Sequence, residues 1–461
     1  MPMKKILPKN KNVRAAILFA AFMFTQFVIL RMGNQAGRGY LSDEKQEFVY
    51  LFIQIAVIVG YICHALAFSS CVRLRIYRPI CAAALALCTA GGTVMLFCGS
   101  ASPFCLSITG ITVFVLGYVG GAVYCRIAAL LRNGKRVGLC VGIGYAAAVL
   151  LQFLLQLNWM FAPFLVVLLL ISFVVMFAFL ADDGDGETPT ADSVENDNYP
   201  RRKLILFAVI TFALLIFTSY YNSYIHHLQV AFGYTAYNVY SWPRLLMIPC
   251  VILFGIIGDI KNGKLLPICT LCVAAVALLN AALSGRDAYL PNMCLYYVAI
   301  TAAISYYHQT FLRAAPYTKR PSLWACMGRI IDSAVVIVSF GLRMAARSQV
   351  AVLIIDIAAL AVIIVAMATN GDFDLSSHIA ADAPDAVENA DDSVDRFSAI
   401  REKYHITPSE MNVLRELVLT DDKQDAIAAR LDISVSTLRH HVTSIYRKTG
   451  VQTRSALCKL K

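Results

Sequence analysis

The chain has 461 residues, of which 59% are hydrophobic and 15% are charged, and its formal net charge is +11. Soluble domains are roughly half apolar, so this composition excludes an ordinary soluble protein and indicates an integral membrane protein. The acidic residues are also unevenly placed. Of 29 Asp and Glu residues, 22 fall in the segments 182–197, 372–395 and 402–432, which leaves seven for all the apolar sequence.

The apolar sequence divides into runs that are long enough to cross a bilayer, for which about 20 residues suffice in a helix. The first six runs are residues 13–30, 47–68, 79–98, 104–125, 137–157 and 160–180. The other six are residues 204–221, 240–257, 265–283, 291–311, 323–341 and 350–369. We therefore predict an all-α, polytopic membrane bundle of twelve transmembrane helices in two groups of six.

The loops between these runs predict how the bundle is oriented, because Lys and Arg favour the cytoplasmic side. With the amino terminus inside, the predicted inner loops hold 20 Lys and Arg residues and the outer loops hold 6. Twelve crossings return the chain to the side on which it began. We expect a multi-pass protein of the cell membrane, in contact with lipid, with both termini in the cytoplasm.

Two acidic segments separate the predicted structural regions. Residues 181–203 are acidic and end in a basic cluster, whereas residues 370–395 contain no Lys or Arg. Such segments bury too little apolar surface to fold and are typical of linkers. The predicted regions are a membrane half-bundle (1–180), an acidic cytoplasmic linker (181–203), a second half-bundle (204–369), an acidic linker (370–395) and a terminal domain (396–461).

One inner loop carries a recognisable motif. The sequence GIIGDIKNGK at residues 255–264 has Gly255, three residues, Asp259 and then basic residues. With the six-plus-six arrangement, this motif resembles the major facilitator superfamily, whose two halves enclose a substrate site at the bilayer midplane. The equivalent loop of the first half, SSCVRLRIYR at residues 69–78, is basic but has no acidic residue. The resemblance implies a transporter-like bundle, and the missing acid argues against vigorous transport.

Ionisable residues inside membrane spans are costly and are therefore candidates for function. Arg244, Arg329, Asp332 and Asp356 lie inside predicted spans and are our candidates for ligand sensing. Two alternatives stay open. Arg329 and Asp332 either neutralise each other at a helix interface, or some of the four groups face a central cavity and bind a charged or polar ligand, or a proton. By the resemblance, spans eight and eleven line the cavity and span twelve is peripheral, which makes Asp356 the weaker candidate.

Small residues in the spans predict close helix packing. Gly117 and Gly121 lie four residues apart in one span, and Gly138 and Gly142 have the same spacing in the next. Glycine at this spacing lets two helix backbones approach each other. We expect these glycines to serve packing rather than ligand binding.

Other residues with reactive or metal-binding side chains do not form a motif for catalysis. Cys269 and Cys272 have metal-ligand spacing but no paired His and no second pair, and His64 and His308 are isolated within apolar runs. The fourteen cysteines are scattered singly as small helix-compatible residues. We find no nucleophile with a partner base and no phosphate-binding loop. We therefore expect no enzyme activity, no metal and no cofactor.

The terminal segment has a different character. Residues 401–461 contain eleven Lys or Arg and seven Asp or Glu residues. Thr407, Pro408 and Glu410 are typical of a helix start, in which Thr caps the helix and Glu occupies its third position. A second short helix is predicted at residues 425–431, and a last one near residues 455–460.

The longest helix of this segment follows Ile433 and presents two faces. Ser434 or Ser436 can cap it, and Gly450 occupies the position that a helix terminator prefers. Its apolar residues recur at helical spacing and predict an inward face: Ile433, Leu438, Val442 and Ile445. A helix, a tight turn and a second helix are the arrangement that places a helix in the major groove of DNA.

The runs ITPSEMNVLREL and AIAARLDISVSTLRHHVTSIYRKTGV resemble the LuxR-type DNA-binding domain along its length. The resemblance implies a four-helix fold with a helix-turn-helix, a double-stranded DNA partner and a homodimer formed through the last helix. It also implies that Arg439, His440 and Thr443 contact base edges, and that four further residues contact phosphates. These four are Ser436, Thr437, Arg447 and Lys448.

Taken with the bundle, this tail predicts a membrane-embedded, one-component transcription regulator. The bundle would sense an unknown small-molecule ligand and control DNA binding by the tail. The first alternative is a secondary transporter of the major facilitator type with a regulatory DNA-binding tail. The second is a tail that serves only protein interaction, which predicts no footprint on any DNA.

Overall fold

In the computed structural model, the chain divides into two units, Met1–His378 and Ile379–Lys461, and each is considered by itself. The described residues of the first unit are 8, 10–36, 41–73, 76–97, 103–132, 134–154, 162–181, 200–232, 242–283, 289–345 and 349–368. Those of the second are 404–419, 425, 427–428, 431 and 433–451. All regular secondary structure within these residues is helical, as predicted.

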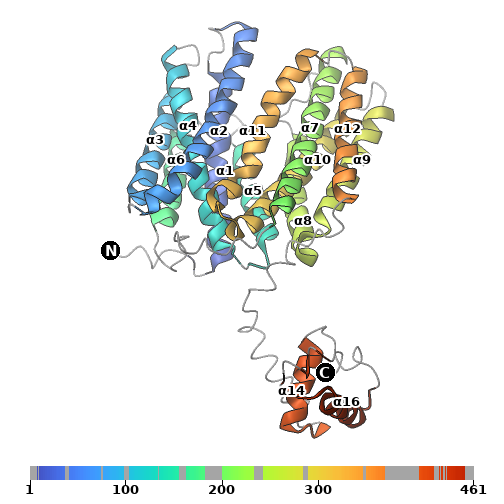
Figure 1. Ribbon diagram of the computed structural model, residues 1–461. Coiled ribbons are helices and arrows are strands. Elements are labelled where there is room, and N and C mark those ends of the chain that lie inside the picture. Colours follow the sequence, from blue (N-terminus) through green and yellow to red (C-terminus); the bar gives the residue numbers. More distant parts are fainter. Residues whose placement is uncertain are drawn as a thin grey trace. The chain divides into compact units, whose positions relative to one another are not determined.

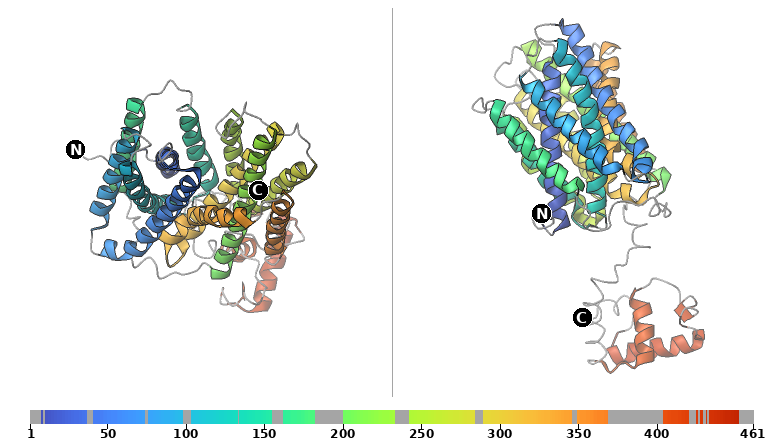
Figure 2. Two further views of the ribbon diagram at one scale, coloured as in Figure 1. Left: turned by 90° about the horizontal axis from the view of Figure 1, so that it is seen from above. Right: turned by 90° about the vertical axis from the view of Figure 1, so that its left-hand side faces the viewer.

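The first unit is a bundle in which the described part of each predicted apolar run is largely helical (Figures 1 and 2). The run 240–257 differs from the prediction, because its residues 242–246 form a 3-10 turn and its α-helix begins only at Met247. The first half comprises α1 (Lys11–Gln35), α2 (Asp43–Arg73), α3 (Tyr77–Phe97), α4 (Pro103–Leu130), α5 (Val137–Leu154) and α6 (Ala162–Ala181). The second half comprises α7 (Arg201–Phe232), α8 (Met247–Asp259), α9 (Leu266–Leu283), α10 (Tyr289–Ala314), α11 (Pro321–Ala345) and α12 (Gln349–Ala368). Short 3-10 turns η3 (Trp242–Leu246), η4 (Ile260–Gly263) and η6 (Ala315–Tyr317) join them.

Length and apolarity make this unit a multi-pass membrane domain. Among the described residues, nine helices are long and apolar enough to cross a membrane, and the apolar stretches Phe164–Leu180 and Leu353–Ala368 are shorter. The helix α10 belongs to neither group, and it carries Asn292, His308 and Gln309 among its buried residues. Twelve spans in two groups of six therefore stay a prediction.

The bundle is apolar both inside and outside. Large aromatic side chains such as Phe22, Tyr124 and Phe217 are fully buried, whereas Leu66, Phe97 and other apolar side chains remain exposed. An exposed apolar surface of this extent marks contact with an apolar environment. In a bilayer that surface faces lipid, so the arrangement agrees with the composition.

The predicted close helix contacts are confirmed by the packing around the glycines. A Cβ atom added at Gly117 would collide with the carbonyl oxygen of Val57 on α2, and one added at Gly138 with the carbonyl oxygen of Gly255 on α8. Gly142 also approaches the α8 backbone, where an added Cβ would lie 2.7 Å from the Val251 oxygen. The helices α5 and α8 belong to different halves, so part of the interface between the halves is backbone against backbone.

The second unit has its own hydrophobic core around two described helices, α14 (Pro408–Leu419) and α16 (Val435–Thr449). The predicted inward residues are confirmed: Leu438, Val442 and Ile445 are buried, and Ile433 packs against the same core. Ile427 and Ala428 of the predicted second helix are buried there too. The predicted last helix and the tether at residues 370–395 lie outside the described residues.

The start of α14 and the end of α16 have the capping interactions that the sequence predicts. The Thr407 amide donates to the Glu410 carboxylate at 2.8 Å, and the Glu410 amide donates to the Thr407 hydroxyl at 3.4 Å, which is a capping box. Gly450 ends α16 with φ of 72°, a left-handed conformation that suits glycine, and its amide donates to the Tyr446 carbonyl.

Candidate functional site

The residues predicted to contact DNA all lie on α16. Six of them have exposed side chains and the seventh, Lys448, is partly buried. The exposed six are Ser436, Thr437, Arg439, His440, Thr443 and Arg447. At 3.6 residues per turn, positions 436, 440, 443 and 447 align along one face of the helix, opposite the buried Leu438 and Ile445. The helix therefore presents a continuous polar face while its other face fixes it to the core.

The start of α16 is organised by Ser434. Its hydroxyl accepts from the Thr437 amide at 3.1 Å and lies 2.8 Å from the Ser436 hydroxyl and 2.7 Å from the Thr437 hydroxyl. Ser434, rather than Ser436, is thus the cap that the sequence left open. A helix N-terminus with hydroxyl groups around it is a favourable place for a phosphate, because amides and hydroxyls both donate.

Lys448 has a partner within the domain. Its ammonium group donates to the Glu410 carboxylate at 2.6 Å and to the His405 carbonyl oxygen at 3.1 Å. Glu410 also accepts from the Ser444 hydroxyl at 2.6 Å. Lys448 therefore joins α16 to the start of α14, in addition to any contact with DNA.

This network sets the ionisation of Glu410. Burial of the carboxyl disfavours its charge, but hydrogen bonds from Lys448, Ser444 and Thr407 outweigh burial and lower its pKa from 4.5 to about 2. Glu410 is therefore ionised at neutral pH and holds the two helices together through charge-assisted hydrogen bonds.

In the bundle, Arg329 and Asp332 form an ion pair on α11, with 2.5 Å between their atoms. The guanidinium also donates to the Tyr307 hydroxyl on α10 at 3.2 Å. The side-chain amide of Gln26 on α1 faces the same group and, with its oxygen in that position, accepts from it. Arg329 thus contacts both halves of the bundle, and we name Gln26, Tyr307, Arg329 and Asp332 the central polar cluster.

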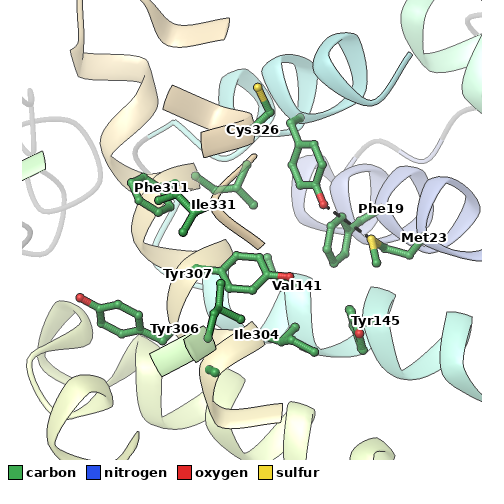
Figure 3. Close-up of a cluster of buried hydrophobic side chains, with 14 of the residues drawn as sticks. Phe19, Met23, Val141, Tyr145, Ile304, Tyr306, Tyr307, Phe311, Cys326 and Ile331 are labelled. Carbon is green, nitrogen blue, oxygen red and sulfur yellow. Dashed lines mark hydrogen bonds between the residues drawn. The ribbon is translucent and has the colours of Figure 1, made fainter. Parts of the chain in front are cut away.

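Aromatic side chains surround this part of the bundle. Figure 3 shows side chains of α1, α5, α10 and α11, among them Phe19, Tyr145 and Tyr307, that converge from both halves. His308 lies within this group and stacks on Tyr124 with 5.6 Å between ring centroids. His308 is therefore packed among aromatic rings.

The other two candidates lie on other elements of the bundle. Arg244 lies in η3 and donates to Gln152 on α5 at 2.5 Å, which is a second polar contact between the halves. Asp356 lies on α12 and is 3% exposed, and its Oδ1 atom has no hydrogen-bond partner among the described residues. The helix α12 packs against α7 and α9, which agrees with the peripheral position expected for it.

The halves also meet at the end of the bundle where α2 and α8 finish and where α5 and α11 begin, which we name the basal end. Here the Asp259 carboxylate accepts from the amides of Gly138 at 2.7 Å and Leu139 at 2.8 Å. It also pairs with Arg313 at 2.5 Å. The acid of the loop motif therefore caps the start of α5 and binds a cation at the end of α10.

A different contact joins α2 to α11 at the basal end. His64 is buried and its Nδ1 atom lies 2.8 Å from the Ser322 hydroxyl at the start of α11. Its Nε2 atom lies 3.2 Å from the Tyr77 hydroxyl at the start of α3. An imidazole and two hydroxyls thus join α2 and α3 of the first half to α11 of the second.

Several of these residues escaped prediction from sequence. Gln26 and Gln152 are uncharged, so the criterion of an ionisable group inside a span does not identify them. An amide side chain within an apolar run is nevertheless itself a signal of a functional or structural polar contact. His64 belongs to no sequence motif, yet it bonds across the two halves. Within the described residues, no group of three or more His, Cys, Asp or Glu side chains could hold a metal ion.

Comparisons with known proteins agree with both parts of the chain. Residues 405–460 match the family "Bacterial regulatory proteins, luxR family". Among solved structures, the human organic anion transporter MFSD10 (TETRAN) is similar with a TM-score of 0.50 and 13% identity, over 78% of this chain and 100% of that one. A bacterial homologue of the iron transporter ferroportin, in an outward-facing state with soaked iron, has a TM-score of 0.47, 11% identity and coverage of 78% and 98%. A comparison with curated proteins gives no match.

The likeness to MFSD10 concerns the fold alone, because only 13% of residues are identical. The match to the luxR family coincides with the region in which α14 and α16 carry the capping box and the exposed polar face. Residues 405–460 are therefore a luxR-family DNA-binding domain, carried by a multi-pass membrane protein whose helical bundle has a major-facilitator-like fold.

Proposed function

We propose that this chain is a one-component transcription regulator of the cell membrane, in which the bundle senses a small ligand and controls DNA binding by the tail. The observation that carries the proposal is the exposed polar face of α16, in a luxR-family domain that shares one chain with a membrane bundle. Regulation of transcription needs the DNA-binding surface, and control from the membrane needs the bundle to have more than one state.

The central polar cluster supports a sensing role for the bundle. Arg329 donates to Tyr307 in the second half and faces Gln26 in the first, so its contacts depend on how the halves are placed. A ligand that bonds to Arg329 or Asp332 competes with these contacts and binds one arrangement of the halves better than another. Such a difference in affinity is what shifts a conformational equilibrium.

In the proposed mechanism the tail lies in the cytoplasm, and the bundle controls DNA binding by changing the oligomeric state of the tail. Twelve predicted crossings and the excess of basic residues in the predicted inner loops, 20 against 6, support a cytoplasmic tail. Pairing of two tails through the predicted last helix, near residues 455–460, would give the two-fold arrangement that reads two half-sites. A reporter fused after Lys461 that is active only outside the cell would contradict this topology.

The central experiment is to map chromosomal sites bound by the full chain and by residues 396–461 alone. We expect both proteins to occupy the same sequences, and only the full chain to change its occupancy when growth conditions change. An unregulated full chain would contradict sensing, and a tail with no bound sites would contradict DNA reading. The latter result would favour a protein-interaction module.

A second test concerns the central polar cluster. We expect Asp332→Asn to alter the response of the full chain while its abundance is unchanged, because the amide oxygen can still accept from Arg329. If abundance collapses instead, Arg329 and Asp332 serve only to stabilise the bundle.

The alternative function is a secondary transporter with a DNA-binding tail. It is supported by the fold, which is similar to that of an organic anion transporter. Proteoliposomes separate the two functions, because a transporter accumulates its substrate in the lumen whereas a sensor binds its ligand without moving it. Organic anions are the first class of compound to test in such an assay.

A further inference from the structure

The surface of the bundle has a pocket that the proposed function does not use. It lies between the start of α3 and the end of α6 and has a volume of about 230 Å³. Its lining combines one arginine with six residues that carry no charge. These are Arg78, Pro79, Cys81, Ala82, Leu85, Phe177 and Leu180.

The position of the pocket defines what surrounds it. The helices α3 and α6 pack against each other, and both leave large apolar side chains exposed, such as Leu87 and Val94 on α3 and Ile171 and Val174 on α6. This surface faces lipid in a bilayer. A molecule that enters the pocket from the side therefore comes from the hydrocarbon phase.

The charge lies at one end of the pocket. Arg78 is exposed and belongs to the first turn of α3, whereas Leu85 lies about two turns, or roughly 10 Å, further along the helix. On α6 the lining residues Phe177 and Leu180 belong to the last turns before Ala181. The pocket thus has a cationic mouth at the basal end and an apolar interior that runs toward the membrane centre.

The sequence segment that leads into α3 is basic. Residues 69–78 contain Arg73 and Arg75 besides Arg78, and no acidic residue. In the proposed topology this loop lies on the cytoplasmic side, where anionic headgroups concentrate and attract basic segments beside membrane helices. Arginine binds phosphate oxygens through two parallel hydrogen bonds, which a lysine does not match.

We propose that this pocket binds one anionic phospholipid, with the phosphate at Arg78 and the upper part of an acyl chain against Ala82, Leu85 and Phe177. A free phosphate ion does not satisfy the apolar interior, and a zwitterionic lipid brings a cation close to Arg78. Occupancy of the pocket would then depend on how much anionic lipid the surrounding leaflet contains, independently of any ligand at the central polar cluster.

The test uses the purified full chain in mild detergent, titrated with phosphatidylglycerol or phosphatidylcholine and followed by native mass spectrometry. We expect the unmodified protein to retain phosphatidylglycerol in preference to phosphatidylcholine. Arg78→Gln should weaken retention of phosphatidylglycerol about tenfold, because a charge-assisted contact to phosphate is lost. Ala82→Trp should abolish retention of both lipids at this site by filling the pocket.

Two further variants control for charge and for folding. Lys135→Gln removes an exposed basic residue between α4 and α5 at the basal end, outside the pocket, and should leave retention unchanged. Arg78→Lys keeps the charge and should retain part of the preference for phosphatidylglycerol. Thermal unfolding followed by tryptophan fluorescence establishes that each variant is folded.

Several results would overturn the proposal. Equal losses in Arg78→Gln and Lys135→Gln would show that basic residues attract the lipid without a site. Retention unchanged by Ala82→Trp would show that the pocket is not involved. If Ala82→Trp converts a dimer into a monomer and leaves lipid retention intact, a second copy of the chain occupies the pocket instead.

Discussion

Arg329 on α11 and Arg439 on α16 are the same residue type in two settings, a membrane bundle and the surface of a DNA-binding domain. The side chain of Arg329 is 13% exposed, and it is paired with Asp332 and bonded to Tyr307. Arg439 is exposed on the polar face of its helix. A buried charged group needs partners inside the protein in place of water. An exposed charged group stays hydrated, and a ligand can replace the water around it.

The comparison predicts its largest effect at Arg329. Arg329→Met leaves Asp332 without its cation and should destabilise the bundle by about 3–5 kcal/mol, whereas Arg439→Met should change stability by less than about 0.5 kcal/mol. Unfolding of the full chain in detergent micelles measures both. The double variant Arg329→Met and Asp332→Leu should recover most of the loss, because it removes both charges. Equal stability of the Arg329→Met and Arg439→Met variants would break the comparison.

The second effect concerns the buried charge of the tail. The pKa of Glu410 is lowered from 4.5 to about 2, so its stabilisation is present above pH 4.5 and is lost as the pH falls toward 2. We expect Glu410→Gln to cost roughly 2 kcal/mol at neutral pH and nothing once wild-type Glu410 is protonated. Denaturant unfolding of residues 396–461, with and without Glu410→Gln, between pH 2 and pH 7 gives the stability of each protein as a function of pH. A constant difference across that range would contradict the role of the charge.

A somewhat smaller effect is expected in DNA recognition by Arg439. If Arg439 reads a base edge, Arg439→Ala should cost about 1–2 kcal/mol on the preferred site and much less on unrelated DNA. Fluorescence anisotropy at one salt concentration, with a duplex that carries the preferred site and a duplex of unrelated sequence, measures the ratio of the two affinities. The same loss on both duplexes would show that Arg439 contacts the backbone only.

The smallest effect separates Arg447 from Lys448. Arg447 is exposed, so Arg447→Ala should weaken binding to every sequence and reduce the slope of log affinity against log salt by about 0.9 per phosphate contact. Lys448→Ala should also flatten the salt dependence and, because Lys448 binds Glu410, lower the stability of the tail as well. Unchanged stability in Lys448→Ala would show that this contact to Glu410 contributes little.

Sequence predicted most of the fold because its signals are local. The described residues of the twelve apolar runs are largely helical, and the capping box at Thr407 and the left-handed Gly450 are set by neighbouring residues. The exposed face of α16 followed from helical spacing alone. The assignment of its residues to bases and phosphates stays a prediction.

The contacts between the halves could not be predicted, because they join residues far apart in the chain. Asp259 binds the start of α5 more than 100 residues away, at separations of 121 and 120 residues for the two amides. His64 and Ser322 are 258 residues apart. Periodicity and spacing say which face of a helix is buried, but not which side chain of another helix meets it. The interaction of Gln26 with Arg329 was missed for the same reason.

The close approach of α5 to α8 has a mechanical consequence. At Gly138 and Gly255 the backbones of the two halves are so close that an added Cβ atom at either glycine would collide with the main chain of the other helix. Main chain is stiff, and the Asp259 carboxylate holds the same helix end by two hydrogen bonds. Small displacements of one half against the other are therefore resisted at this contact.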